Sequence, residues 1–202
     1  MIRLVLISKT VFSMHNIEIL KLLSVSLTRD KQSILEEELQ KYGAATNWTI
    51  KQILKKGLSS RSRTIEELQD NFSIMFDKRN TYLDDVVKTA SAEITKHRKL
   101  AKTIRTMRDK TPFFKPGRLI FSQPIVKLSD KAVTLTLSDG SLLPIPFDKR
   151  SRNRVAEKIS AILRGSREGE VNRNYDRIRI TWNKEGFADI DIRAMRQNSM
   201  SS

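Results

Sequence analysis

The sequence predicts an α+β fold, in which an antiparallel β-barrel-like, OB-like domain carries an inserted helical subdomain. Three observations support this prediction. A single strand pattern over residues 17–27 comes first, helical periodicity runs from residue 30 to about 109, and strand patterns with tight turns fill most of the remainder. Because an unpaired strand exposes its backbone polar groups, we expect the first strand to join the later sheet. The helices then form an insertion between them.

These patterns divide the 202 residues into four parts. We expect an N-terminal extension over residues 1–16, in which the stretch before Met14 is an upstream extension of the reading frame. The β domain comprises residues 17–29 and 111–194, the helical subdomain residues 30–110, and a disordered tail residues 195–202. The first apolar run is broken by Lys9, is far shorter than a membrane span and lacks a cleavage site. We therefore expect a cytoplasmic protein with no signal peptide and no membrane contact.

Three helices are expected in the insertion. The first ends near Gly57 and carries a broad apolar stripe formed by Ile34, Leu35, Leu39, Tyr42, Ala45, Trp48, Ile50, Ile53 and Leu54. The second begins at a capping box of Thr64 and Glu67 and packs through Leu68, Phe72, Met75 and Phe76. The third and longest follows Asn80, and its apolar face comprises Leu83, Val87, Ala90, Ile94, His97, Ala101, Ile104 and Met107.

The strands are predicted from alternating apolar residues. In the first strand, Leu23, Val25 and Leu27 alternate with two serines. A later meander is expected to place Val126 and Leu128 opposite Val133 and Leu135, and Leu137 opposite Leu142 across an Asp139-Gly140 turn. A short helix follows, packs Val155, Ile159, Ile162 and Leu163, and ends at Gly165.

A final hairpin is expected at the end of the β domain. Its loop is Lys184-Glu185-Gly186, with Gly186 in the left-handed conformation. The resulting register makes Ile178, Ile180 and Trp182 face Ile192, Ile190 and Ala188. The same register places Arg179 opposite Asp191, so these two side chains are expected to form an ion pair.

The composition points to a polyanionic partner. The formal net charge is +15, from 38 Lys and Arg against 23 Asp and Glu. Such an excess favours binding to nucleic-acid phosphates through counterion release. The chain has no Cys, which excludes disulfides, zinc ribbons and thiol nucleophiles, and its two histidines, His15 and His97, lie far apart. We expect no metal and no cofactor.

Two basic segments and one aromatic pair are the candidate nucleic-acid contacts. Between residues 78 and 110 there are ten basic and four acidic residues, and a second basic run begins at residue 149, where helix N-terminal amides would add to the attraction of phosphate. Phe113 and Phe114 lie in a lysine-flanked connection. The full candidate set is Lys78, Arg79, Lys88, Lys96, Lys99, Lys102, Arg105, Arg108, Lys110, Phe113, Phe114, Lys115, Lys149, Arg150, Arg152, Arg154 and Lys158.

No catalytic centre is predicted. Asp189 and Asp191 alternate on one strand as in metal-dependent nucleases, but cleavage with two metal ions needs carboxylates from several elements. The expected Arg179 partner favours an ordinary hairpin surface. His97 falls on an apolar helical face, and the sequence contains no phosphate-binding glycine loop. We therefore expect a binding protein and not an enzyme.

Several segments resemble one protein family. The order KLLSVSLTRDKQSILEEELQKYGAATNWTIKQIL, YLDDVVKTASAEITKHRKLAKTI and FFKPGRLIF, followed by a strand-rich close, resembles the N-terminal half of TnpB proteins over about residues 17 to 193. These are transposon-encoded, RNA-guided DNA nucleases related to type V CRISPR effectors. The resemblance implies a wedge barrel with an inserted helical recognition subdomain and an aromatic, proline-containing link back to the barrel.

The chain departs from that family after the wedge. A TnpB protein continues into a RuvC-like nuclease domain, whereas FADIDIRAM lacks the expected glycine and fits the last wedge hairpin, so neither Asp inherits a catalytic role. The resemblance implies binding of guide RNA and of a short duplex DNA motif beside the target, without cutting. Lys88 matches a basic position of the motif-reading helix, and Ala92 stands where a polar reader would lie. A separate RuvC-like nuclease chain is a candidate partner.

Two alternatives remain open at this point. The first is a stand-alone DNA-binding transcriptional regulator that docks its helical block on a duplex. The second is a non-catalytic interaction module, which would show no salt-dependent binding of nucleic acid. Guide identity, target motif and oligomeric state do not follow from the sequence.

Overall fold

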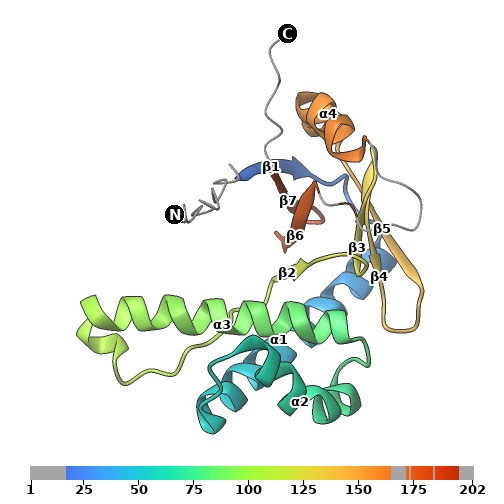
Figure 1. Ribbon diagram of the computed structural model, residues 1–202. Coiled ribbons are helices and arrows are strands. Elements are labelled where there is room, and N and C mark those ends of the chain that lie inside the picture. The colour runs from blue at the N-terminus through green and yellow to red at the C-terminus, as the bar shows by residue number, and fades with distance from the viewer. Residues whose placement is uncertain (1–16, 165–171, 173, 184, 196–202) are drawn as a thin grey trace, which may run out of the picture.

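A computed structural model describes residues 17–164, 172, 174–183 and 185–195, and it has an α+β fold (Figure 1). The expected extension over residues 1–16, the helix end at Gly165, loop residue Lys184 and residues 196–202 lie outside the described residues. The helices are α1 (Arg29–Lys56), α2 (Arg61–Met75), α3 (Asn80–Thr103) and α4 (Lys149–Leu163), with a 3₁₀ turn η1 (Arg105–Met107). The strands are β1 (Ile17–Leu23), β2 (Arg118–Phe121), β3 (Val126–Leu128), β4 (Ala132–Thr136), β5 (Leu142–Pro146), β6 (Tyr175–Trp182) and β7 (Ala188–Met195).

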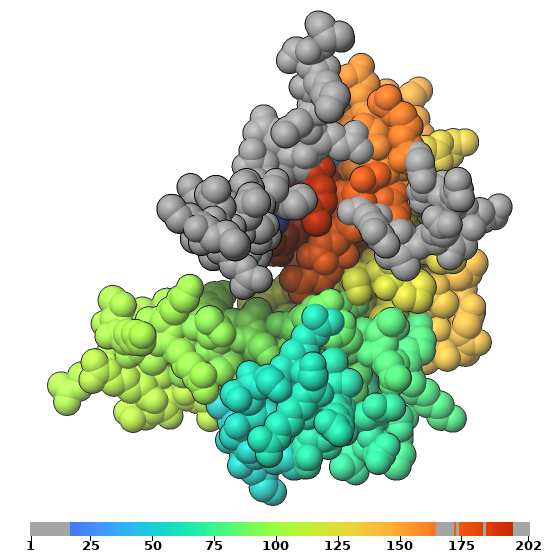
Figure 2. Space-filling model, in the orientation of Figure 1, coloured from blue at the N-terminus to red at the C-terminus, as the bar shows by residue number. Residues whose placement is uncertain are grey.

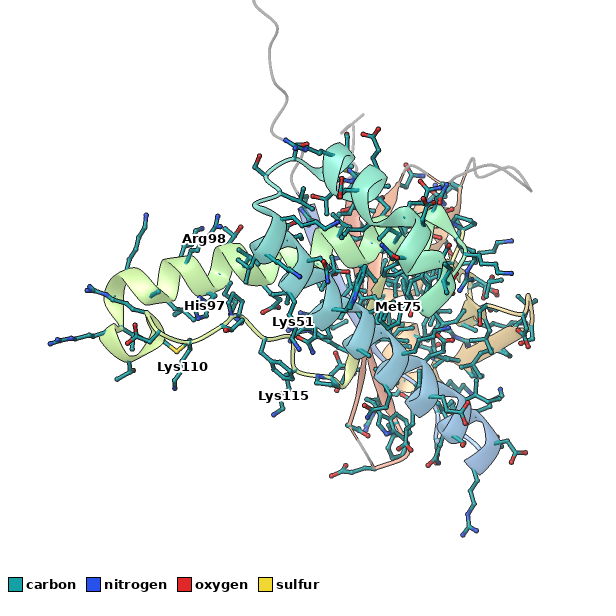
Figure 3. All side chains as sticks on the ribbon, turned by 90° about the horizontal axis from the view of Figure 1, so that it is seen from below. Lys51, Met75, His97, Arg98, Lys110 and Lys115 are labelled. Carbon is teal, nitrogen blue, oxygen red and sulfur yellow. The ribbon has the colours of Figure 1, made fainter. Side chains whose placement is uncertain are left out.

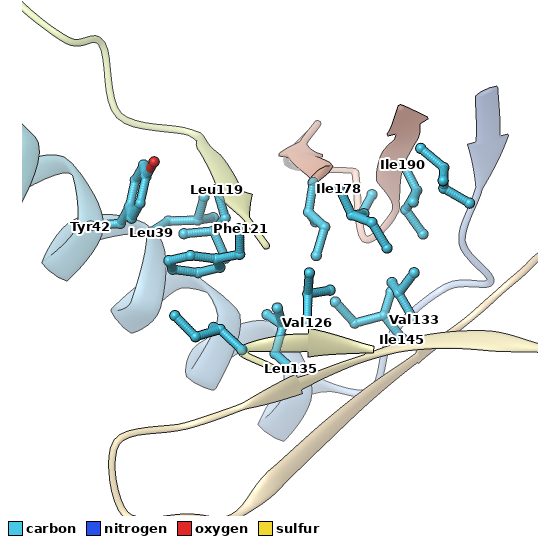
Figure 4. Close-up of a cluster of buried hydrophobic side chains, with 14 of the residues drawn as sticks. Leu39, Tyr42, Leu119, Phe121, Val126, Val133, Leu135, Ile145, Ile178 and Ile190 are labelled. Carbon is cyan, nitrogen blue, oxygen red and sulfur yellow. The ribbon is translucent and has the colours of Figure 1, made fainter. Parts of the chain in front are cut away.

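The described strands form two antiparallel sheets and not a closed barrel. One sheet has the order β1-β7-β6-β2, and the other is the meander β3-β4-β5. Their apolar faces oppose each other, so that Ile178 and Ile190 of the first sheet lie over Val126, Val133 and Ile145 of the second (Figure 4). Since these buried side chains alternate with exposed or half-buried ones along each strand, each sheet buries one face.

The first strand pairs with the last, as expected. β1 runs antiparallel to β7, with Leu20 opposite Ile192. The expected phase beyond Leu23 is wrong, because Ser24 is buried and Val25 is exposed. The Ser24 hydroxyl accepts a hydrogen bond from the Ala188 N–H at 2.8 Å and donates one to the Val25 carbonyl. A serine whose hydroxyl is satisfied in this way occupies an inward position at little cost.

The predicted register is confirmed in the β6–β7 hairpin and is only partly correct in the β3-β4-β5 meander. In the β6–β7 hairpin all three apolar pairs and the Arg179–Asp191 pair are confirmed, and Gly186 has a positive φ of 89°. In the meander, the pairing of β3 with β4 is confirmed, but Leu142 lies opposite Thr136 and is 63 % exposed. The turn ends one residue earlier than expected, because the Leu137 N–H donates to the Ser141 carbonyl and Leu137 therefore lies opposite Ser141 instead of Leu142. Leu143 and Ile145 therefore enter the core.

The three helices of the insertion pack around aromatic side chains. Tyr42 of α1 is fully buried and makes edge contacts with Tyr82, Phe114 and Phe121. Its hydroxyl is within 2.7 Å of the Thr89 hydroxyl and donates to the Ile120 carbonyl at 3.2 Å. One side chain thus joins α1, α3 and β2, which carry the insertion onto the sheet.

The expected helix limits and stripes need three corrections. α2 is capped by Ser60, whose hydroxyl accepts the Arg63 N–H, whereas Thr64 is buried one turn inside the helix. The helix starts earlier than predicted because the Ser60 hydroxyl satisfies a backbone N–H of the first turn, which Thr64 was expected to do. α3 ends at Thr103, where Ile104 takes an extended conformation. The exposed members of the predicted stripes are Ile34, Leu54, Met75 and Ile104, which lie where no second element covers the helix.

A buried carboxylate fastens α3 to the sheet. Asp85 accepts hydrogen bonds from the Ser122 N–H at 2.7 Å and from the Ser122 hydroxyl at 2.9 Å, just beyond β2. Burial raises the pKa of Asp85 and outweighs the lowering by these hydrogen bonds. No described helix is long and apolar enough to cross a membrane.

Candidate nucleic-acid interface

The end of α3 forms a projection that we call the basic arm, defined as residues 96–115. It comprises the last turns of α3, the turn η1 and the return link to β2. Figure 1 shows α3 extending well past α1 and the sheets, and Figure 2 shows the same projection in space-filling form. The arm contains eight Lys and Arg residues and one Asp. Its charge density therefore far exceeds that of the whole chain.

The arm projects because the apolar face of α3 stops before the helix does. Ile94 is the last buried apolar residue of α3. Beyond it, His97 and Ala101 are half-buried, and the Arg108 guanidinium donates to the Ala101 carbonyl at 3.2 Å. The His97 Nε2 atom is enclosed without a hydrogen-bond partner among the described residues, so the expected core histidine is only partly confirmed. Beyond Ile94 the arm is thus held by its own return link.

The cations of the arm are exposed and make no ion pair with any described residue. They are Lys96, Arg98, Lys99, Lys102, Arg105, Arg108, Lys110 and Lys115. Lys96 and Lys99 also border a shallow depression floored by Ser91, Ala92 and Thr95. Because unpaired cations are available to an external anion, this is the strongest candidate site on the described surface.

Arg79 does not belong to this surface. Its guanidinium donates to Asp77 at 2.7 and 2.8 Å and to the Thr136 carbonyl at 2.6 Å. It therefore joins the start of α3 to β4 and is unavailable to phosphate. Burial acts to raise the pKa of Asp77, but hydrogen bonds and charge from Arg79, with Lys41, outweigh it and lower that pKa. The predicted nucleic-acid contact at Arg79 is therefore wrong, because Asp77, two residues earlier, and Thr136 of β4 both bind its guanidinium.

Lys78 and Lys88 differ in availability. Lys78 is exposed, whereas Lys88 is half-buried and lies 3.1 Å from Asp84 and 3.8 Å from Asp85. The acidic pair one turn earlier on α3 thus neutralises Lys88 locally. Lys88 lies on α3 between Asp85 and the arm, and it is less available to a phosphate than Lys78 is.

The two adjacent phenylalanines face opposite ways. Phe113 is 65 % exposed, whereas Phe114 is completely buried. The predicted ligand contact at Phe114 is therefore wrong, since its ring packs on Tyr42 and under the Arg118 guanidinium. Tyr42, Tyr82, Tyr175 and Trp182 are also buried, as expected for core aromatics.

The second basic run lies at α4, away from the arm (Figure 1). Lys149, Arg150 and Arg154 are exposed and Arg152 is half-buried, while Lys158 pairs with Glu18. The first turn is already capped, because the Asp148 carboxylate accepts the Ser151 N–H at 2.9 Å. The expected help from N-terminal amides is thus reduced by a negative cap, and the two basic segments do not form one site.

The carboxylates of β7 form no metal site. Asp189 is exposed, and Asp191 accepts a hydrogen bond from the Arg179 Nε at 2.9 Å. Nearby, Arg177 and Arg193 lie within 4 Å of Asp176. No group of three or more His, Asp or Glu residues that could hold a metal ion occurs in the described part of the chain.

Lys51 is a candidate that the sequence analysis did not identify. It is exposed on α1, one turn beyond Asn47, which binds the return link at Phe114 (Figure 3). Residues four apart on a helix share a face, so Lys51 lies toward the link that carries Lys115. Lys51 and Lys115 are distant in sequence and come near each other only because the link packs on α1. The sequence analysis considered only the apolar stripe of α1, so it did not identify Lys51.

Comparison with known proteins adds no identification. No protein-family model matches the chain, and no curated protein matches it.

Proposed function

We propose that this protein is a non-catalytic nucleic-acid-binding protein, and that the basic arm is its main contact with phosphate. The unpaired, exposed cations of the arm carry the proposal, because such charges gain most from releasing the counterions of a nucleic acid. Elsewhere charges are more often used internally, as at Arg79, Arg179 and Lys158. Among the described residues, this projection thus carries the largest group of exposed, unpaired cations.

Within this proposal, the chain acts as a TnpB-like, OB-like wedge with a recognition insertion, in the cytoplasm. It binds guide RNA and contacts duplex DNA beside the target, and a separate RuvC-like chain would supply cleavage. The order of strand, inserted helices, aromatic link and closing hairpin supports this form. The alternative is a stand-alone DNA-binding regulator, which the exposed outer face of α3 also suits. RNA that copurifies and survives DNase treatment favours the first form, whereas purely DNA-dependent binding favours the second.

The arm is tested by replacing Lys96, Lys99 and Lys102 together with alanine. We expect weaker binding to RNA and DNA, and a log–log dependence of affinity on salt that is shallower by up to about 3. The thermal midpoint should change little, because exposed substitutions shift stability by only about 0.5 kcal/mol each. Fluorescence anisotropy at several salt concentrations measures both quantities.

The matched control removes the same charge from another surface. Lys21, Lys127 and Lys131 are exposed and lie outside the arm and α4. Their joint replacement by alanine should leave the salt dependence nearly unchanged. Equal losses in the two triple variants would mean that net charge alone drives binding, and the arm would lose its special role.

A second test concerns catalysis. We expect no Mg²⁺-dependent cleavage of RNA or DNA, because Asp191 is engaged by Arg179 and Asp189 has no carboxylate cluster around it among the described residues. The purified protein and the Asp189→Ala, Asp191→Ala double variant should be equally inactive in a gel assay. Cleavage by the wild type that disappears in the double variant would contradict the assignment.

A further inference from the structure

We infer that Phe113 is a stacking platform for an exposed nucleobase, which belongs either to an unpaired nucleotide or to the last pair at a helix end. The inference rests on the proposed function and adds a ligand class to it. Phosphate contacts by the arm require no base at all, whereas a stacking platform selects nucleic acids that present one.

The backbone around Phe113 is fixed by its neighbour. The Asn47 side chain forms two hydrogen bonds with Phe114, accepting its N–H at 2.8 Å and donating to its carbonyl at 3.0 Å. The Phe114 ring is buried between Tyr42, at 5.6 Å between centroids, and Arg118, whose guanidinium lies 4.7 Å from the ring centroid. Phe114 is thus held in the core, while the adjacent Phe113 is 65 % exposed, so its ring faces away from this support.

The link is also fitted closely to α1. Pro112 and Pro116 lie on either side of the two phenylalanines and restrict the backbone between them. Pro116 packs against Gly43, where an added Cβ would come within 3.0 Å of the Pro116 Cγ. The exposed ring therefore stands on a support with few alternative conformations, which lowers the entropy lost when a ligand stacks on it.

Charge around the ring favours a nucleotide over an apolar partner. Lys110 and Lys115 lie on either side of Phe113 in the link, and both are exposed. Lys51 lies on the face of α1 that binds the link (Figure 3). An exposed aromatic ring with lysines near it in the chain is the combination that binds single-stranded nucleic acids, in which the base stacks and the backbone is neutralised.

The test compares Phe113→Leu, which keeps an apolar side chain, with Phe113→Tyr, which keeps an aromatic ring. The probe is a single-stranded thymidine oligomer of about 12 nucleotides, and its control is an abasic oligomer with the same number of phosphates. We expect Phe113→Leu to weaken thymidine binding about tenfold and Phe113→Tyr to weaken it little. Neither variant should change the salt dependence or the abasic affinity. Phe113→Leu should also keep the thermal midpoint, since the ring is exposed.

Two further probes distinguish the sources of the base. A blunt duplex offers only terminal pairs, and the same duplex with one unpaired 3′ nucleotide adds a free base. Sensitivity to Phe113→Leu with both probes identifies end stacking, and sensitivity with the second alone identifies an unpaired nucleotide. Equal binding of the thymidine probe by Phe113→Leu and wild type would overturn the stacking role and leave the arm intact. Wild type that binds no probe would overturn the proposed function itself.

Discussion

Replacing Ile94 with aspartate is expected to lower the free energy of unfolding by about 4 kcal/mol. Ile94 is 4 % exposed and is the last residue of the apolar face that holds α3 on the insertion core. The substitution removes about 2 to 3 kcal/mol of apolar burial and places a carboxylate in apolar surroundings. Urea unfolding followed by circular dichroism measures the change.

The neighbouring residue supplies the control. Thr95 is exposed, so Thr95→Asp adds the same carboxylate to the same helix on its outer face. We expect this variant to shift stability by no more than about 0.5 kcal/mol. If Thr95→Asp unfolds the protein and Ile94→Asp does not, the two faces of α3 are reversed and the basic arm is wrongly placed.

Replacing Asp77 with asparagine is expected to cost about 2 to 3 kcal/mol at neutral pH, less than for a fully buried pair because Arg79 and Lys41 remain partly hydrated. The pKa of Asp77 lies below its ordinary value of 3.8 in the folded protein. A lowered pKa contributes stability that is present above the unfolded pKa and lost as the pH falls through the folded pKa. The difference between wild type and Asp77→Asn should therefore be largest near pH 7 and shrink below about pH 4.

Chemical denaturation at a series of pH values tests this expectation, with Asp130→Asn as the control. Asp130 is exposed in the turn between β3 and β4 and has no ion pair within the described structure. That variant should follow the wild type at every pH. A constant gap between Asp77→Asn and wild type from neutral to acid pH would show that the carboxylate charge does not stabilise the fold.

Periodicity predicted the regular elements well. The alternation of Ile178, Ile180 and Trp182 defined one face of β6, and a glycine loop then left a single register with β7. The long third helix was likewise evident from its apolar face up to Ile94. In both cases many residues carry the same signal, so one error does not change the result.

The errors occur where one residue decides the outcome. Two adjacent phenylalanines in a link have no periodicity, and the burial of Phe114 depends on Asn47, 67 residues earlier. Arg79 resembles any other cation of the basic segment until Thr136 of β4 is brought beside it. Tertiary contacts of this kind leave no local pattern, and they decided which candidate residues remain available to a ligand.

The pairing of β1 with β7 also constrains how the chain folds as it is made. Leu20 finds its partner Ile192 only after 172 further residues have been synthesised. At about 5 to 20 residues per second, the first strand waits roughly 10 to 30 seconds on the ribosome. The three helices of the insertion pack on one another within residues 29–103, so they can associate long before β7 is made. Until β7 emerges, β1 therefore lacks the strand it pairs with, and its unpaired backbone groups can pair with another chain.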